Sequence, residues 1–114
     1  MKLNQIVEKL KLTVATKTSD LNVDVTGGYV SDLLSDVMAH ARKGNIWITL
    51  QIHQNTVAVA TLKDLAGIVL IHGKIPAQET IQKAEQENVP ILISDQPAFE
   101  VICGLCKMGI TGGK

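Results

Sequence analysis

The sequence has few aromatic residues, few cysteines, no excess of charge of either sign and no long apolar run. Its only aromatic residues are Tyr29, Trp47 and Phe99, so its core has to be built from aliphatic side chains. Its two cysteines, Cys103 and Cys106, are too few for a disulfide framework. These shortages argue against a disulfide-stabilised fold and against an aromatic stacking surface for single-stranded nucleic acid.

Charge and hydropathy narrow the class of protein further. Eleven Lys and Arg residues balance 11 Asp and Glu residues, and the basic residues form no stripe, so nucleic-acid binding has no electrostatic support. No apolar stretch is long enough to span a membrane and no leader-like segment opens the chain, so we expect a cytoplasmic protein that binds neither membrane nor nucleic acid. With 114 residues, 46% of them hydrophobic, the chain is expected to form one domain over residues 1–114.

Apolar periodicity predicts helices that alternate with short strands. The predicted helices cover residues 3–10, 30–41, 55–66, 77–88 and 98–108, and the predicted strands cover residues 12–16, 22–25, 46–50, 68–71 and 89–93. This alternation predicts an α/β fold: a three-layer α/β/α sandwich around a mostly parallel sheet of about four to six strands. Further predictions are an N-terminal helix within residues 1–11, a polar turn at residues 17–20 and a flexible tail at residues 110–114.

The residues Thr26, Gly27 and Gly28 are predicted to form a tight turn between a strand and the following helix. Glycine permits a positive φ and a close approach of a ligand or another chain to the backbone. A helix that begins near Ser31 would point its free amides at the same corner, which makes this turn a candidate site for a phosphate or a carboxylate. A tight connection that needs glycine for its geometry alone explains the same residues equally well, and the sequence leaves both interpretations open.

Polar residues also follow two later strands of the predicted sheet. Thr49, His53 and Asn55 lie at the end of one strand and just beyond it, and His72 closes the next. Because turns that follow parallel strands gather at the carboxyl edge of a sheet, we expect these residues to share one pocket with the diglycine turn. An imidazole, an amide and a hydroxyl suit recognition of a base or a ribose, although Asn55 is expected mainly to cap its own helix.

Motifs for catalysis and metal binding are absent or incomplete. Cys103 and Cys106 form a C-x-x-C motif late in a predicted helix, where we expect small buried hydrophobic residues rather than a redox or zinc pair. Asp32 and Asp36 lie one turn apart and are expected on a solvated helix face. We therefore expect no catalytic residue, no metal site and no cofactor, and we do not expect an enzyme.

Three stretches of the chain resemble the DRTGG domain family over about residues 23–110: DVTGG, IWITLQIHQNTVAVATL and GIVLIHGKIP. The motif of this family normally has Arg at the position of Val25. Such domains occur beside CBS domains in nucleotide-regulated inorganic pyrophosphatases and in some phosphotransacetylases, and their fold is similar to that of the N-terminal domain of HPr kinase. The resemblance implies a non-catalytic regulatory or assembly module that forms a homodimer or a higher homo-oligomer.

Two functional hypotheses follow from the residues and the resemblance together. In the first, the module associates with itself and binds an adenine-type nucleotide or another phosphorylated ligand. The candidate ligand-binding residues are Thr26, Gly27, Gly28, Ser31, Thr49, His53, Asn55 and His72. In the second, the chain is a protein-interaction domain that acts on a partner enzyme and takes no small molecule.

Overall fold

A computed structural model describes residues 1–17 and 20–113 of the chain, and these residues form helices on both faces of one sheet. The helices are α1 (Leu3–Lys9), α2 (Leu34–His40), α3 (Asn55–Lys63), α4 (Gln78–Glu87) and α5 (Ala98–Lys107). The strands are β1 (Thr13–Val14), β2 (Gly27–Val30), β3 (Asn45–Thr49), β4 (Gly67–Leu70) and β5 (Ile91–Ile93). The strand order is β1-β5-β4-β3-β2, with β2 to β5 parallel and β1 antiparallel to β5. The predicted α/β class and mostly parallel sheet are confirmed.

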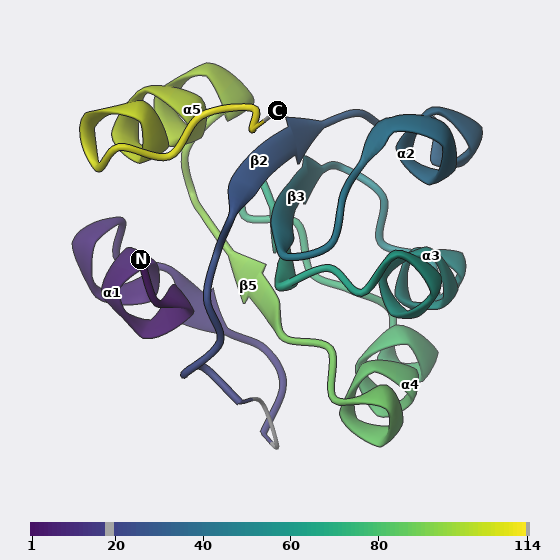
Figure 1. Ribbon diagram of the computed structural model, residues 1–114. Helices are drawn as coiled ribbons and strands as arrows, with labels where there is room; N and C mark the ends of the chain where they lie inside the picture. Colours follow the sequence, from purple (N-terminus) through teal and green to yellow (C-terminus); the bar gives the residue numbers. More distant parts are fainter. Residues whose placement is uncertain (18–19, 114) are drawn as a thin grey trace.

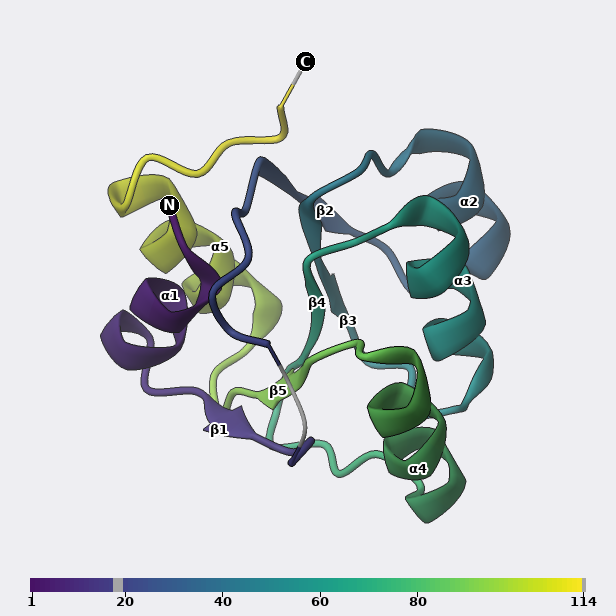
Figure 2. The same ribbon diagram turned by 60° about the horizontal axis from the view of Figure 1, so that its bottom comes forward.

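The sheet separates two layers of helices, each with its own apolar cluster. Helices α1 and α5 lie on one face and helices α2, α3 and α4 lie on the other (Figures 1 and 2). Strand β3 is buried along its whole length and contributes to both layers. Ile46 and Ile48 pack with α1 and α5, while Trp47 packs with α2, α3 and α4. This division follows from the alternation of side chains along a strand, and it explains why β3 is apolar at consecutive positions.

The segment at residues 22–25 is not a strand of the sheet, and the sequence prediction is wrong there. Leu3 N donates to Val23 O (2.9 Å) and Val25 N donates to Met1 O (2.8 Å), so the segment runs beside the start of α1. The Val25 side chain is buried in the cluster under α1 and α5. Pairing with β3 begins only at Gly27, and α2 correspondingly begins at Leu34 rather than near residue 30.

The apolar face of α5 and the end of the chain also differ from expectation. Phe99 is 75% exposed and Cys106 is exposed, whereas Val101 and Leu105, one turn apart, are buried. The predicted flexible tail is wrong at its start, because Ile110 is buried and Thr111 O accepts a hydrogen bond from Gly28 N (2.8 Å). Residues 18 and 19 of the predicted turn and residue 114 of the tail lie outside the described residues.

Among residues 1–17 and 20–113, none of the helices combines the length and the apolar character needed to cross a membrane.

Candidate functional site at the carboxyl edge of the sheet

The parallel strands β2 to β5 end at one edge of the sheet, and hydrogen bonds join the loops that follow them. The joining contacts are Gln51 Nε2 to Asp32 O (3.0 Å), Ala77 N to Ile52 O (3.2 Å) and His72 N to Gln96 O (3.0 Å). Each contact links the loop after one strand to the loop after its neighbour. The carboxyl edge is therefore one continuous surface whose loops support one another.

Asp32 holds the end of β3, a role that the sequence analysis did not identify. Its Oδ1 atom accepts hydrogen bonds from Thr49 Oγ1 (2.8 Å) and from Leu50 N (2.7 Å). Thr49 itself is 2% exposed. Its hydroxyl group donates its proton to Asp32, and its side chain is buried. Thr49 therefore stabilises the loops at this edge. No local sequence signal indicates this role, because the two partners of Asp32 lie 17 and 18 positions further along the chain.

His53 and Asn55 are linked by a local hydrogen bond at the start of α3. His53 Nδ1 accepts a hydrogen bond from Asn55 N (3.3 Å), and His53 O accepts one from Thr56 Oγ1 (2.8 Å). The residue that precedes α3 is Gln54, and no side chain caps this helix. The prediction that Asn55 caps α3 is therefore wrong. Both His53 and Asn55 are exposed, so the amide of Asn55 is accessible to solvent.

His72 lies on the same edge, directly after β4. Its backbone is left-handed, with φ at 55°, and the following Gly73 N donates to Ser94 O (2.7 Å). Two backbone hydrogen bonds thus anchor this turn to the loop after β5, while the His72 side chain is exposed. Thr49, His53, Asn55 and His72 share one edge, as the sequence predicted.

The diglycine segment lies at the opposite, amino end of the sheet. Gly27 pairs with Asn45, the first residue of β3, whereas Thr49 is the last residue of that strand. Four residues of strand separate these positions, which corresponds to about 13 Å. Two hydrogen bonds hold Thr26 at this end, and both join it to residues just before β3. Thr26 Oγ1 donates to Lys43 O (2.8 Å), and Thr26 N donates to Gly44 O (2.9 Å).

The expected pocket that unites all eight residues is therefore wrong for Thr26, Gly27 and Gly28. The two glycines lie within β2, and neither is among the residues with positive φ. At Gly27 the lack of a side chain serves packing instead. A Cβ on Gly27 would lie 3.0 Å from Thr111 O, so the close approach of the tail to β2 favours glycine at this position.

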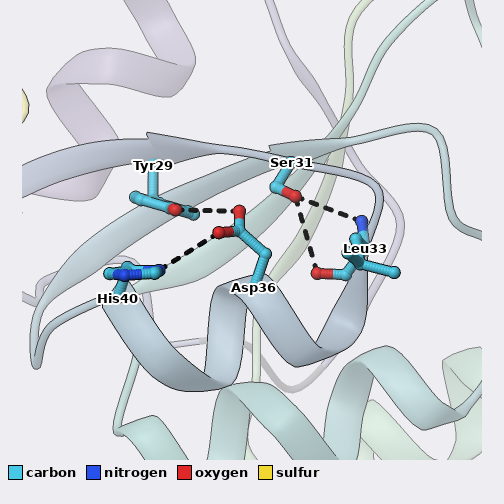
Figure 3. A network of polar contacts seen from close by, with 5 residues as sticks. All are labelled: Tyr29, Ser31, Leu33, Asp36 and His40. Carbon is cyan, nitrogen blue, oxygen red and sulfur yellow. Dashed lines mark hydrogen bonds and ion pairs between the residues drawn. The ribbon is translucent and has the colours of Figure 1, made fainter.

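Ser31 belongs to the carboxyl edge through its position after β2, and it borders a polar network on α2 (Figure 3). Its Oγ atom accepts from Leu33 N (3.1 Å). Beside it, Tyr29 Oη donates to Asp36 Oδ2 (2.8 Å), and His40 Nδ1 lies 3.1 Å from Asp36 Oδ1 (Figure 3). The Tyr29 hydrogen bond lowers the pKa of the Asp36 carboxyl group, with smaller contributions from Ser31 and His40, and it raises the pKa of the Tyr29 hydroxyl.

Cavities open at several places away from the four polar residues of the carboxyl edge. Three of them, of about 160, 460 and 410 Å³, lie respectively between β2 and α5, near Lys43 and Asp64, and between α1 and α5. None of these three is lined by Thr49, His53, Asn55 or His72. Within residues 1–17 and 20–113, no group of three or more His, Cys, Asp or Glu side chains is placed to hold a metal ion.

Comparison with known proteins relates this fold to a regulatory region. No protein-family model matches the sequence, and no curated protein does. Among solved structures, the chain is similar to the CBS and DRTGG domains of the regulatory region of Clostridium perfringens pyrophosphatase, complexed with the activator diadenosine tetraphosphate. The TM-score is 0.73 at 15% sequence identity. The match covers 90% of this chain and 44% of that chain, so this chain spans less than half of the other's length. At this identity the likeness shows a shared fold.

Proposed function

We propose that residues 1–114 form a single non-catalytic regulatory module of the DRTGG type, which acts in the cytoplasm by self-association and by binding an adenine-type nucleotide. The regulatory role is supported by the fold shared with a pyrophosphatase regulatory region. The observation that carries the proposal is the carboxyl edge, where hydrogen-bonded loops hold exposed polar side chains in fixed places. Such prior ordering reduces the entropic cost of binding a ligand.

We propose that the ligand binds at the carboxyl edge and not at the diglycine segment. His53, Asn55 and His72 are exposed there and offer two imidazoles and an amide to a base or a phosphate. Ser31 and Thr49 contribute by supporting the loops that carry these groups. An adenine nucleotide is the favoured ligand class because the related regulatory region was crystallised with diadenosine tetraphosphate.

A thermal-shift titration with AMP, ATP and diadenosine tetraphosphate tests this assignment. A ligand present at about 100 times its Kd stabilises the folded chain by about 2.7 kcal/mol, which raises the melting temperature by roughly 10 °C in a chain of this size. The variants His53→Ala and His72→Ala are expected to reduce the shift. His40→Ala is the matched control, since His40 lies on α2 and contacts Asp36. No shift with any nucleotide, or equal shifts in all three variants, would contradict nucleotide binding.

A second candidate function is a protein-interaction domain that acts on a partner enzyme without a small-molecule ligand. The separation of the diglycine segment from His53 favours it, because the phosphate-binding corner expected next to the imidazole is not there. Under this alternative, nucleotides leave the melting temperature unchanged, and the purified chain binds its partner enzyme with the same affinity in their presence.

A further inference from the structure

Exposed, large apolar side chains follow each of the parallel strands at the carboxyl edge. They are Leu33 (65% exposed) after β2, Leu50 and Ile52 (38% each) after β3, Ile75 (67%) after β4 and Phe99 (75%), which lies in the first turn of α5 after β5. We call these five residues the apolar rim. Single exposed apolar residues are ordinary on protein surfaces, but a set that gathers on one edge marks a site of interaction.

The members of the apolar rim follow one another along the edge of the sheet. The strand order β5-β4-β3-β2 puts the connections that carry Phe99, Ile75, the pair after β3 and Leu33 in that order along the edge, and the strands that they follow are about 4.8 Å apart. The hydrogen bonds between neighbouring loops hold this row together, and one of them is accepted by the carbonyl oxygen of Ile52 itself (3.2 Å from Ala77 N). The loops that carry the rim residues are therefore held in fixed positions relative to one another.

We propose that the apolar rim is the contact surface between two copies of this chain, related by a twofold axis. The inference rests on the assembly role proposed above, for which it names the partner and the surface, and it does not depend on nucleotide binding. In such a dimer each copy contributes the same five side chains to the interface.

The exposed area of the apolar rim matches what a stable dimer needs. If a large apolar side chain has about 200 Å² of surface, the five exposed fractions amount to roughly 570 Å². A standard interface buries about 800 Å² on each partner, of which somewhat more than half, about 450 Å², is apolar. The rim thus supplies the apolar share of one half-interface without the need for any rearrangement of the loops.

The charges at this edge suit contact with a copy of the same surface. Lys74 precedes Ile75, and Asp95 lies on the neighbouring loop, so both signs occur within the same patch, and both side chains are exposed. A patch of one sign would repel its twofold mate, whereas a mixed patch allows pairing of opposite charges across the axis. The formal net charge of the whole chain is zero, so two copies do not repel each other at long range.

Sedimentation equilibrium over a concentration series tests the proposal. The wild-type chain is expected to sediment as a species of twice the 12.3 kDa chain mass. Phe99→Lys and Ile75→Lys, made separately, are each expected to raise the dimer dissociation constant at least about 30-fold, because each variant places a charge in the apolar contact. All samples contain a reductant, because Cys106 is exposed and an intermolecular disulfide would imitate a dimer.

Leu62→Lys is the matched control for these variants. Leu62 is 73% exposed, as exposed as Phe99, but it lies at the end of α3, away from the carboxyl edge. Its substitution is expected to leave the dissociation constant unchanged, and circular dichroism confirms that every variant is folded. A wild-type chain that stays monomeric, rim variants that dimerise normally, or a control that weakens the dimer equally would each overturn the proposal. Because the apolar rim and the candidate nucleotide site share the carboxyl edge, the sedimentation runs contain no nucleotide. A chain that dimerises but shows no shift in melting temperature with any nucleotide contradicts nucleotide binding alone, and a monomeric chain that does show a shift contradicts the dimer alone.

Discussion

Replacement of Gly27 by alanine is expected to destabilise the fold, whereas the same change at Gly28 is expected to be neutral or mildly stabilising. A Cβ on residue 27 would lie 3.0 Å from Thr111 O and 3.2 Å from both Asn45 Nδ2 and Gly113 N. Two of these atoms belong to the backbone, so the tail has to move. Overpacking of this kind costs about 1–3 kcal/mol, and the reduced freedom of the unfolded alanine chain offsets about 0.4–1 kcal/mol. The expected net loss in the free energy of unfolding is therefore about 0–2.6 kcal/mol, centred on about 1.3 kcal/mol.

Gly28 differs from its neighbour in what surrounds it. A Cβ there would lie 3.7 Å from Ile46 Cγ2 and 3.8 Å from Ile46 O, which are ordinary van der Waals distances. Gly28 is also not among the residues with positive φ, so alanine adopts its backbone conformation without strain. Only the effect on the unfolded chain remains, and Gly28→Ala is expected to raise the free energy of unfolding by up to about 1 kcal/mol.

Urea unfolding followed by tryptophan fluorescence measures both variants, because Trp47 is the only tryptophan and is fully buried. A third comparison isolates the cause of the loss. Deletion of residues 111–114 removes two of the three close contacts to a Cβ at residue 27, so Gly27→Ala should cost less in the truncated chain than in the full one. The difference between the two costs is the energetic contribution of the tail contact.

The result that would refute this reasoning is a loss at Gly28 equal to or greater than the loss at Gly27. Such a result would mean that residue 28 adopts the left-handed turn predicted from the sequence, in which any Cβ is strained. An unchanged cost of Gly27→Ala after tail deletion would show that the close approach of Thr111 and Gly113 is not responsible.

Two further substitutions test the polar groups at the end of β2. Tyr29→Phe removes the hydrogen bond that lowers the pKa of Asp36. Since a lowered carboxyl pKa contributes stability above the unfolded value of about 3.8, and loses it as pH falls through the folded value, the variant should lose more stability at pH 7 than at pH 2 in urea titrations. Equal losses at both pH values would contradict this. Asp32→Ala removes the acceptor for Thr49 Oγ1 and Leu50 N and should cost about 1–3 kcal/mol, whereas Asp32→Asn keeps an acceptor and should cost less than half as much. Equal costs in thermal unfolding would show that this acceptor does not hold the end of β3.

Much of the fold could be predicted because its signals are local. The apolar run at 46–50 and the helical periodicity at 98–108 come from residues that act within a few positions of one another, and β3 and α5 lie close to where they were expected. The start of β2 was missed for the opposite reason. Whether residues 22–25 or 27–30 pair with β3 depends on contacts with Met1 and Leu3, which lie more than twenty positions away.

The positions of the candidate-site residues that depend on local signals were predicted correctly, and those that depend on distant contacts were not. Thr49, His53 and His72 each follow a strand that the sequence located correctly, so their common edge followed from the rule for parallel sheets. The diglycine was assigned to that edge because glycine after a β-rich run is typical of a turn. Its true role, the close approach of residues 111–113, is invisible in local sequence because the residues that require it are over 80 positions away.

The sequence by itself determined the layers of this protein, because the periods of apolar residues decide which face of each helix and strand leaves water. It also determined that the core is aliphatic and that polar residues follow the strands. Only the tertiary structure decided which loops meet, that the diglycine supports packing at the amino end, and that five apolar side chains gather at the carboxyl edge. These features depend on register and on contacts between distant segments, and no periodicity within a single segment encodes the position of another.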